Sequence, residues 1–285
     1  MIQWLLQSVA DMPDLESGGA AAPWLSSPEQ ERLTYLHFEK RRREWLLGRW
    51  TAKLLVQSYV EQVTGQRLPL EALIIGREPE GQPLAALDAH FAPDGFVAGA
   101  IQPIPLVAAK WRKPGEESLK VAGVRLPVSL SISHSGNYAL SALALTASGI
   151  RQIGVDVEMV EPRESRFVDR YYTVEESTLI QRCAPEWQEM LITAVWSAKE
   201  AVLKALRLGL TVDTRHLSCL PEGTIGQYDA PSGERSQGPL AGWQSLRIQC
   251  APDVLAKSPV ACGHGRLIGW WRLSPGYALT MAALR

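Results

Sequence analysis

The sequence predicts an α+β fold, because long helical patterns and period-two strand patterns follow one another along the chain. Residues 28–55 and 187–206 carry apolar side chains at near-helical spacing. Residues 128–133 and 153–158 alternate with the period of a β-strand. Both kinds of element occur in each half of the chain, so we expect two α+β halves.

An internal repeat supports this division. The segment from Tyr138 to Leu145 reads YALSALAL and is nearly repeated as YALTMAAL from Tyr277 to Leu284. Each copy follows a turn that contains glycine. The repeat favours two similar halves, 1–148 and 149–285, related by a pseudo-twofold axis with a cleft between them. The alternative is that two similar buried strands arose by chance.

Each predicted element has a local signal. Ser27 is the candidate N-cap of a helix, and Pro28 is suited to its first turn. The turn Ser135-Gly136-Asn137 joins two alternating segments into a predicted β-hairpin. The remaining expected elements are loops and irregular strands over 76–127, a helix over 174–182, a loop over 221–242, and strands near 244–250 and 266–284.

Composition excludes several classes of protein. The 285 residues are 46% hydrophobic, enough for a sizeable core, and Lys+Arg 29 against Asp+Glu 30 gives a net charge of -1. This balance argues against a protein that coats nucleic acid or an anionic membrane. The N-terminus shows neither a signal peptide nor a membrane helix. Four scattered cysteines without a C-x-x-C pair indicate reduced thiols in a cytoplasmic protein: Cys183, Cys219, Cys250 and Cys262.

The first predicted helix has a local excess of positive charge that the whole-chain balance conceals. Between residues 39 and 53, only Glu39 and Glu44 oppose its cations. An anionic ligand could therefore dock on this helix. The cations are Lys40, Arg41, Arg42, Arg43, Arg49 and Lys53.

Asp156 and Glu158 lie two residues apart on a predicted strand, so their carboxylates project from the same face. Two neighbouring carboxylates repel each other unless a cation lies between them. Oxygen ligands without nearby His or Cys favour Mg²⁺ or Mn²⁺. The alternative is an ordinary solvated strand face.

The helix around Trp196 offers a third carboxylate. Trp196, Glu200 and Lys204 are spaced by four and share one stripe of the helix. Taken alone, Glu200 and Lys204 could be an exposed ion pair. Together with the acidic strand, Glu200 could complete a magnesium site, and Lys204 could neutralise phosphate.

Ser133 and His134 end a strand at a turn, where a hydroxyl and an imidazole can meet a ligand. Neighbouring residues on a strand point to opposite faces, and no G-x-S-x-G surrounds them, which argues against a Ser-His nucleophile. A phosphate-binding histidine is the functional interpretation. A structural histidine in a turn is the alternative.

In this order the segments resemble the Sfp-type 4′-phosphopantetheinyl transferases. The resemblance rests on Ile132-Ser-His-Ser-Gly136, Ile153-Gly-Val-Asp-Val-Glu158 and Trp196-Ser-Ala-Lys-Glu-Ala-Val-Leu-Lys204, which matches W-[SA]-x-K-E-[SA]-x-x-K at every fixed position. Residues 86–127 and 221–242 are not covered by it. The family fold consists of two similar α+β halves with coenzyme A between them.

The resemblance implies transfer of phosphopantetheine from coenzyme A to a serine of an apo acyl or peptidyl carrier protein, with release of 3′,5′-ADP. Asp156, Glu158 and Glu200 would hold Mg²⁺, and Glu200 would also be the base for the serine. Lys199 and Lys204 would lie beside the pyrophosphate. The other phosphate contacts implied are Ser133, His134, Arg43, Arg49 and Lys53, the last three at the 3′-phosphate.

One departure concerns the Gly-Lys-Pro that the family often has before the histidine motif. This chain has Gly81-Gln82-Pro83, so Gln82 brings no charge, and Arg77 is a candidate replacement. We expect a monomer, because one chain already builds the cleft. The expected carrier-binding rim is Arg163, Arg166, Arg170, Tyr171 and Tyr172, with an ordinary solvated loop as the alternative.

Two other functions remain open after the sequence analysis. A module that binds carrier protein or coenzyme A without transfer would not need three converging carboxylates. A magnesium-dependent phosphohydrolase would be expected to have a phosphate-cradling glycine motif, which the sequence lacks.

Overall fold

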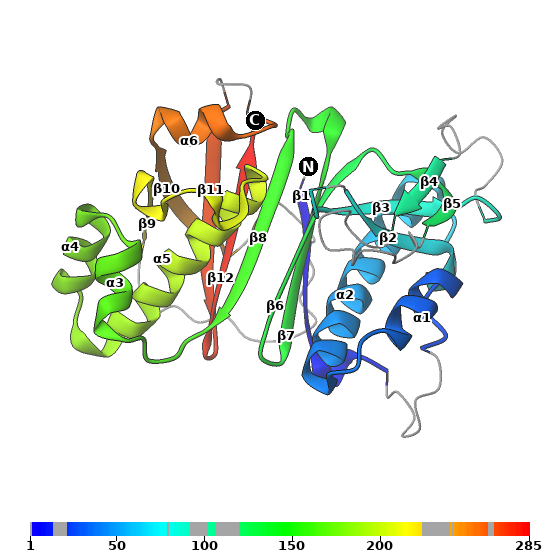
Figure 1. Ribbon diagram of the computed structural model, residues 1–285, viewed down its shortest axis with the longest axis horizontal. Coiled ribbons are helices and arrows are strands. Elements are labelled where there is room, and N and C mark those ends of the chain that lie inside the picture. The colour runs from blue at the N-terminus through cyan, green and yellow to red at the C-terminus, as the bar shows by residue number, and fades with distance from the viewer. Residues whose placement is uncertain are drawn as a thin grey trace.

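Figure 1 shows the computed structural model of the chain. It describes residues 2–13, 22–78, 80–91, 102–105, 120–223, 240, 242–261 and 265–285. Most of the 221–242 loop, much of the 86–127 segment and Cys262 lie outside the described residues. Within the described part, the other three cysteines are unpaired, and no helix has the length and apolarity needed to cross a membrane.

Helices and strands are mixed along the chain, which confirms the α+β prediction. The helices are α1 (Ser27–Thr34), α2 (Glu39–Thr64), α3 (Ser165–Tyr171), α4 (Val174–Arg182), α5 (Pro185–Ala205) and α6 (Pro252–Lys257). The strands are β1 (Ile2–Ser8), β2 (Leu73–Arg77), β3 (Pro83–Asp88), β4 (Gln102–Pro105), β5 (Lys120–Arg125), β6 (Val128–Ser135), β7 (Tyr138–Leu145), β8 (Gln152–Met159), β9 (Leu217–Pro221), β10 (Gln244–Cys250), β11 (Leu267–Ser274) and β12 (Tyr277–Leu284).

Two units of the chain have the same topology. In the first unit, β1 is followed by α2 and then by the hairpin β6–β7, and the sheet order is β1-β7-β6. In the second unit, β8 is followed by α5 and then by the hairpin β11–β12, and the order begins β8-β12-β11. The repeated octapeptides are therefore the equivalent strands β7 and β12, each paired antiparallel with its unit's first strand.

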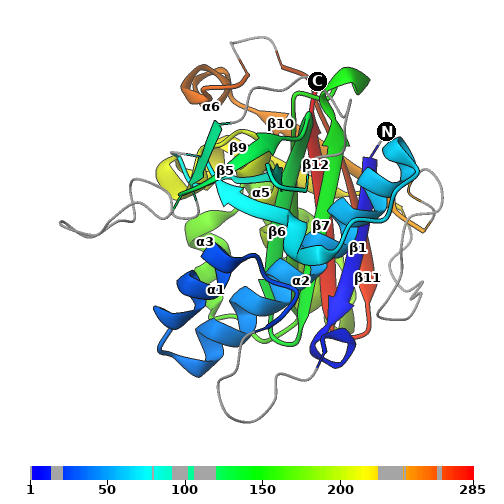
Figure 2. The ribbon, with the colours of Figure 1, turned by 90° about the vertical axis from the view of Figure 1, so that its right-hand side faces the viewer.

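A shared core joins the two units on the faces of their sheets that do not carry α2 or α5. Alternate residues of β7 and β12 enter it, because side chains along a strand alternate between faces. The shared core contains Trp4, Leu140, Val155, Leu279 and Met281, among others. The opposite faces pack on α2 and α5 in two further clusters. Figure 1 shows β6 and β8 side by side where the units meet, and Figure 2 shows the molecule from the side of α1 and α2.

The structure changes some predicted boundaries. The helix expected over 28–55 is two helices, since the chain turns between Tyr35 and Phe38. Its N-cap is Ser26 rather than Ser27, in a capping box with Glu29. The final strand expected over 266–284 is the hairpin β11–β12, which turns at Gly276 with φ 74. The hairpin over 128–145 is confirmed.

Candidate active site

Lys204, Asp156 and Ser133 meet at the junction of the two units, although they come from three separate motifs. The Lys204 ammonium lies 2.7 Å from Asp156 Oδ1 and donates to Ser133 Oγ at 3.0 Å and to the Val155 carbonyl at 3.0 Å. Ser133 Oγ donates to the same Asp156 oxygen at 2.7 Å. An ammonium has three donors, so Lys204 is fully satisfied by the protein itself.

The position of Lys204 follows from the face that α5 buries. Ala201, Val202 and Leu203 are buried against the sheet. Three residues spaced by four, Trp196, Glu200 and Lys204, are partly exposed, as the predicted stripe requires. Gly154 lets α5 approach β8, because a Cβ there would lie 2.0 Å from the Ala201 carbonyl oxygen.

The acidic residues influence one another, although they are not gathered into a closed cluster. Burial and then the charge of Asp156 raise the pKa of Glu158 to about 7, while Arg163 acts in the opposite direction. Burial and Asp156 also raise the pKa of Glu200. Among the described residues, no three His, Cys, Asp or Glu side chains are close enough together to hold a metal ion as they stand.

One oxygen of this group fits a hard cation. Asp156 Oδ2 is buried and has no hydrogen-bond partner among the described residues, whereas Oδ1 is taken by Lys204 and Ser133. A buried carboxylate oxygen without a partner is costly unless a cation or donor satisfies it. Carboxylate oxygens are the donors that Mg²⁺ and Mn²⁺ prefer in proteins.

His134 lies at the exposed end of β6, beside α2. A Cβ added to Gly48 on that helix would lie 3.8 Å from the imidazole Cδ2. Burial of part of the ring lowers the pKa of His134, and Lys204 and Arg77 add to this effect while Glu44 opposes it. A neutral imidazole at the edge of the junction can donate or accept one hydrogen bond.

The predicted role of Lys199 at the pyrophosphate is corrected by the structure. Lys199 is completely buried, and its ammonium lies 2.9 Å from Glu176 Oε2. It also donates to the carbonyls of Thr214 and Leu217. Its partners lie on α4 and on the segment before and within β9, so its charge is already used inside the second unit.

Lys53 is corrected for the same reason. Its ammonium is completely buried, lies 2.5 Å from Glu29 Oε2, and donates to the carbonyls of Trp24 and Leu70. Burial lowers the pKa of Lys53, and the Glu29 charge opposes this effect. Lys53 therefore holds α1 and the segment before β2 on α2 and does not point to a ligand.

The sequence contains a signal for this pairing that the motif analysis missed. Trp50-Thr-Ala-Lys53 on α2 is repeated as Trp196-Ser-Ala-Lys199 on α5. In both units the lysine meets a glutamate that closes a capping box, Glu29 with Ser26 and Glu176 with Thr173. Each glutamate also accepts a strand N–H, from Ile75 on β2 and from Cys219 on β9.

Arg43 and Arg49, the two arginines expected at the 3′-phosphate, differ in their surroundings. Arg43 is exposed in the second turn of α2. Arg49 is buried, lies 3.8 Å from Glu29, and packs its guanidinium 5.0 Å from the Trp45 ring centre. Burial and then the neighbouring Arg77 lower the pKa of Arg49 to about 9.

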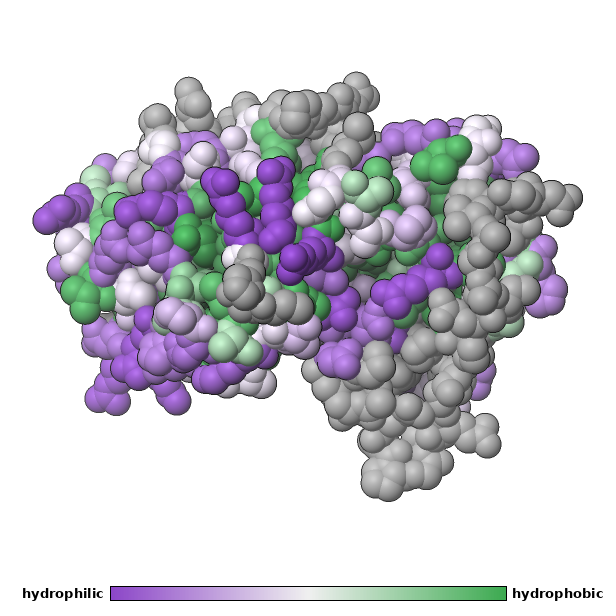
Figure 3. Space-filling model, turned by 90° about the horizontal axis from the view of Figure 1, so that it is seen from above, coloured by the Kyte–Doolittle hydropathy of each residue, from purple (hydrophilic) through white to green (hydrophobic). Residues whose placement is uncertain are grey.

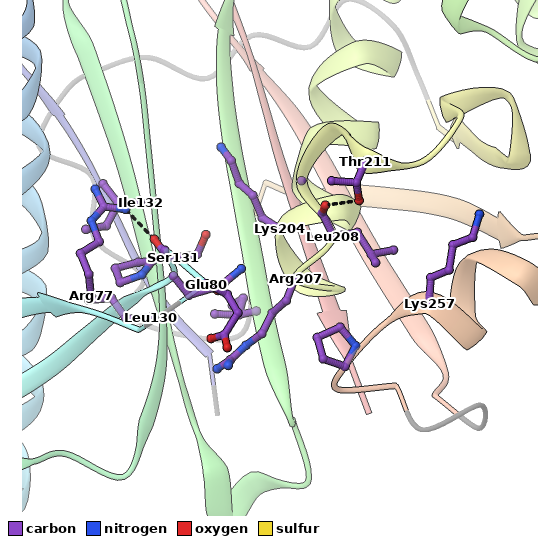
Figure 4. Close-up of a pocket in the computed structure, with 16 residues that line it drawn as sticks. Arg77, Glu80, Leu130, Ser131, Ile132, Lys204, Arg207, Leu208, Thr211 and Lys257 are labelled. Carbon is purple, nitrogen blue, oxygen red and sulfur yellow. Dashed lines mark hydrogen bonds between the residues drawn. The ribbon is translucent and has the colours of Figure 1, made fainter. Parts of the chain in front are cut away.

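A cleft of about 720 Å³ opens between the two units. Arg77, Gln82 and Ser131 line it from the first unit and its neighbouring strands, and Lys204 lines it from the second. Figure 4 shows Arg77 on one wall and Lys204, Arg207 and Lys257 on the other. Hydrophilic side chains gather near the middle of the face viewed in Figure 3. The cleft thus presents several cations to a ligand, with Glu80 as the opposing charge.

Arg207 is a cleft residue that the sequence analysis did not single out. It follows the end of α5 with φ 58, a left-handed conformation that costs a non-glycine residue about 1–2 kcal/mol. Its Nε is buried without a hydrogen-bond partner among the described residues. Arg207 lines the cleft, and backbone strain at such a place is typical of a functional residue.

The expected carrier-binding rim is only partly exposed. Arg166 and Arg170 are exposed on α3, and Tyr171 stacks edge-on against Trp196 with ring centres 5.3 Å apart. Arg163 lies 3.5 Å from Glu158. Tyr172 is corrected, because it is buried and its hydroxyl donates to the Ile192 carbonyl at 2.6 Å.

The match to a known protein family lies in the second unit. Residues 152–244, which include Asp156, Glu158, Glu200 and Lys204, match the model of the 4′-phosphopantetheinyl transferase superfamily. The resemblance to this superfamily is confirmed. Its Sfp-type subtype remains a prediction.

Curated relatives carry the same name. The chain is 25% identical over 202 residues to the 4′-phosphopantetheinyl transferase HetI of a Nostoc species, a match that covers 70% of this chain and 66% of that protein. It is 25% identical over 152 residues to the 4′-phosphopantetheinyl transferase AcpT of Salmonella typhi, covering 53% of this chain and 72% of that one. The chain thus spans slightly less than two thirds of the Nostoc relative.

Solved structures of phosphopantetheinyl transferases show weaker likeness. The ACPS–CoA complex of Chronobacterium ammoniagenes aligns with a TM-score of 0.34 at 17% identity, covering 47% of this chain and 95% of that one. Thermotoga maritima holo-[acyl-carrier-protein] synthase aligns with a TM-score of 0.32 at 16% identity, covering 48% and 64%. Likeness at this level carries no further conclusion.

Proposed function

We propose that this protein transfers 4′-phosphopantetheine from coenzyme A to a serine hydroxyl of an apo carrier protein. The observation that carries the proposal is the meeting of Ser133, Asp156 and Lys204, one from each recognised motif, next to a cleft lined by cations. The superfamily match over residues 152–244 supports it. We also propose that the two halves of this fold are residues 1–148 and 149–285.

The reaction forms one bond and breaks one. The serine oxygen of the carrier attacks the phosphorus that bears pantetheine, the bond from that phosphorus to the bridging oxygen breaks, and 3′,5′-ADP leaves. The serine proton passes to a base, for which Glu200 is our candidate, since it is a partly exposed carboxylate that interacts electrostatically with Asp156 and Lys204.

Mg²⁺ is the ion that the donor set fits, and Asp156, Glu158 and Glu200 would hold it. When bound, it would neutralise charge on the diphosphate oxygens. Glu200 would then serve as ligand and base at once, so a water between Glu200 and the serine is part of the proposal. Lys204 already uses its three donors, so it must release one internal partner to contact a phosphate oxygen.

The cleft suggests how the rest of coenzyme A is held. Arg77, Arg207 and Lys257 can contact phosphate oxygens, and Arg77 replaces the charge that Gln82 lacks. We place the 3′-phosphate near Arg77 and the exposed Arg43. Arg49 is buried beside Arg77 and acts on the same site through its charge. His134 and the exposed Arg166 and Arg170 are our candidates at the carrier-facing edge.

Three expectations from the sequence stay proposals: a monomer, a cytoplasmic location supported by the three unpaired thiols, and acceptors in fatty acid, polyketide or peptide synthesis. The proposed function is tested by incubating the protein with coenzyme A, Mg²⁺ and an apo carrier, then measuring the carrier mass. A carrier heavier by one phosphopantetheine supports transfer. An unchanged carrier that co-purifies with the protein would support the non-catalytic binding module instead.

A further inference from the structure

Strands β6 and β8 lie side by side without a backbone ladder, and serine side chains connect them. The two strands contact each other but belong to different sheets. Ser129, Ser131 and Ser135 face β8, because alternate residues of a strand share a face. Their hydroxyls accept the N–H groups of Ile153 at 3.0 Å, Val155 at 3.0 Å and Met159 at 3.2 Å.

These bonds form a regular row. Each serine hydroxyl accepts from the backbone N–H 24 residues further along the chain. The serines occupy every second position of β6, except that Ser133 does not make such a bond. A row that continued through Ser133 would bond the N–H of Val157. The hydroxyl of Ser133 instead donates to the side chain of Asp156 at 2.7 Å and accepts from Lys204 at 3.0 Å.

Because Ser133 bonds Asp156 instead of a backbone N–H, the two carboxylate oxygens of Asp156 have different hydrogen-bond partners. Oδ1 accepts from Ser133 and from Lys204, while Oδ2 is buried with no partner among the described residues. Two donors on one oxygen fix the rotation of a carboxylate and leave its second oxygen for another ligand. Ser133 is itself buried, and both of its side-chain hydrogen bonds are to site residues.

We propose that Ser133 is a positioning residue, which orients Asp156 so that Oδ2 is presented to the cation, and is not a phosphate contact. The proposal rests on the metal site of the proposed function. It replaces the role that the family resemblance implied for Ser133. The other three serines hydrogen-bond β6 to β8, and Ser133 hydrogen-bonds β6 to the site residue Asp156.

The test compares Ser133→Ala with Ser129→Ala as a matched control. Ser129 is an equally buried serine of the same row, and it bonds Ile153 and Gln152 rather than a site residue. Mn²⁺ affinity is measured by electron paramagnetic resonance in the absence of coenzyme A. We expect Ser133→Ala to weaken Mn²⁺ binding about 10- to 100-fold. Ser129→Ala should keep the affinity and lower the melting temperature, and Ser133→Thr, which retains the hydroxyl, should restore binding.

A second measurement separates positioning from phosphate contact. Coenzyme A binding is followed by calorimetry in EDTA, where no divalent cation contributes, and Ser133→Ala should bind as the wild type does. Unchanged Mn²⁺ affinity in folded Ser133→Ala, or weaker coenzyme A binding in EDTA, overturns the proposal while the proposed function stands. A wild-type protein that transfers phosphopantetheine but binds no Mn²⁺ also overturns it. A wild type that does neither overturns the proposed function first.

Discussion

Lys53 and Lys199 are equivalent residues: each is completely buried in the long helix of its unit, and each ammonium lies against the glutamate of a capping box. The equivalence extends to individual hydrogen bonds, since each lysine ammonium also donates to two backbone carbonyls. Buried charges persist only when they are paired and hydrogen-bonded. Both lysines therefore belong to the framework of the fold.

A substitution at Lys199 should destabilise the fold. We expect Lys199→Met to leave Glu176 unpaired and to lower the free energy of unfolding by about 3–5 kcal/mol. Denaturant titration measures this loss. Adding Glu176→Gln should recover part of it, because no uncompensated charge then remains buried. If Lys199→Met kept the wild-type stability but lost transfer activity, the structural role would be contradicted and a phosphate contact by Lys199 would be supported.

The sequence predicted the faces of strands and helices better than it predicted the role of each residue. The alternation of β8 and the spacing of four on α5 follow from local geometry, so Asp156, Glu158, Glu200 and Lys204 were placed on the correct faces. The partners of Lys53 and Lys199 come from distant segments, and a motif does not reveal a tertiary ion pair. Ser133 illustrates the same limit, since its hydroxyl meets Lys204 from 71 residues away.

The raised pKa of Glu158 should make stability depend on pH. Burial and Asp156 raise the pKa of Glu158 from 4.5 to about 7, so the folded protein binds a proton more tightly than the unfolded chain does. The contribution of Glu158 to stability is thus greatest below pH 4.5 and is lost as pH rises through about 7. Mg²⁺ competes with that proton, so it should raise the melting temperature more at pH 8 than at about pH 5.5.

The control for that measurement is Glu158→Gln, which removes the ionisable group. The metal-free variant should be more stable than the wild type at pH 8 and should show a smaller response to Mg²⁺. An equal Mg²⁺ response at both pH values in the wild type would contradict a role for Glu158 in binding the ion.

Lys204 should oppose cation binding while it supports transfer. Its ammonium lies 2.7 Å from Asp156, so Lys204→Met removes a competing positive charge from the proposed metal ligand, while the Ser133 hydroxyl still donates to Asp156 Oδ1. We expect tighter Mn²⁺ binding and a kcat about 100- to 1000-fold lower, because charge on the leaving diphosphate is no longer offset. Electron paramagnetic resonance and carrier mass give the two values. A fall in both, or in neither, would contradict the assignment.

Arg77 should recognise the 3′-phosphate of coenzyme A. Arg77→Ala should raise the KM for coenzyme A about tenfold and change the KM for dephospho-coenzyme A little, because only the former carries that phosphate. Steady-state kinetics with the two donors measures the difference. Lys257→Ala, at the opposite side of the cleft, is the comparison variant. An equal rise in KM with both donors would contradict a contact between Arg77 and the 3′-phosphate.

The most direct measurement is the mass of an apo carrier after incubation with coenzyme A, Mg²⁺ and either wild-type protein, Asp156→Asn or Glu200→Gln. With circular dichroism confirming that both variants are folded, we predict a carrier enlarged by phosphopantetheine with the wild type alone. Modification by either folded variant at the wild-type rate would contradict a reaction carried out by acids from β8 and α5.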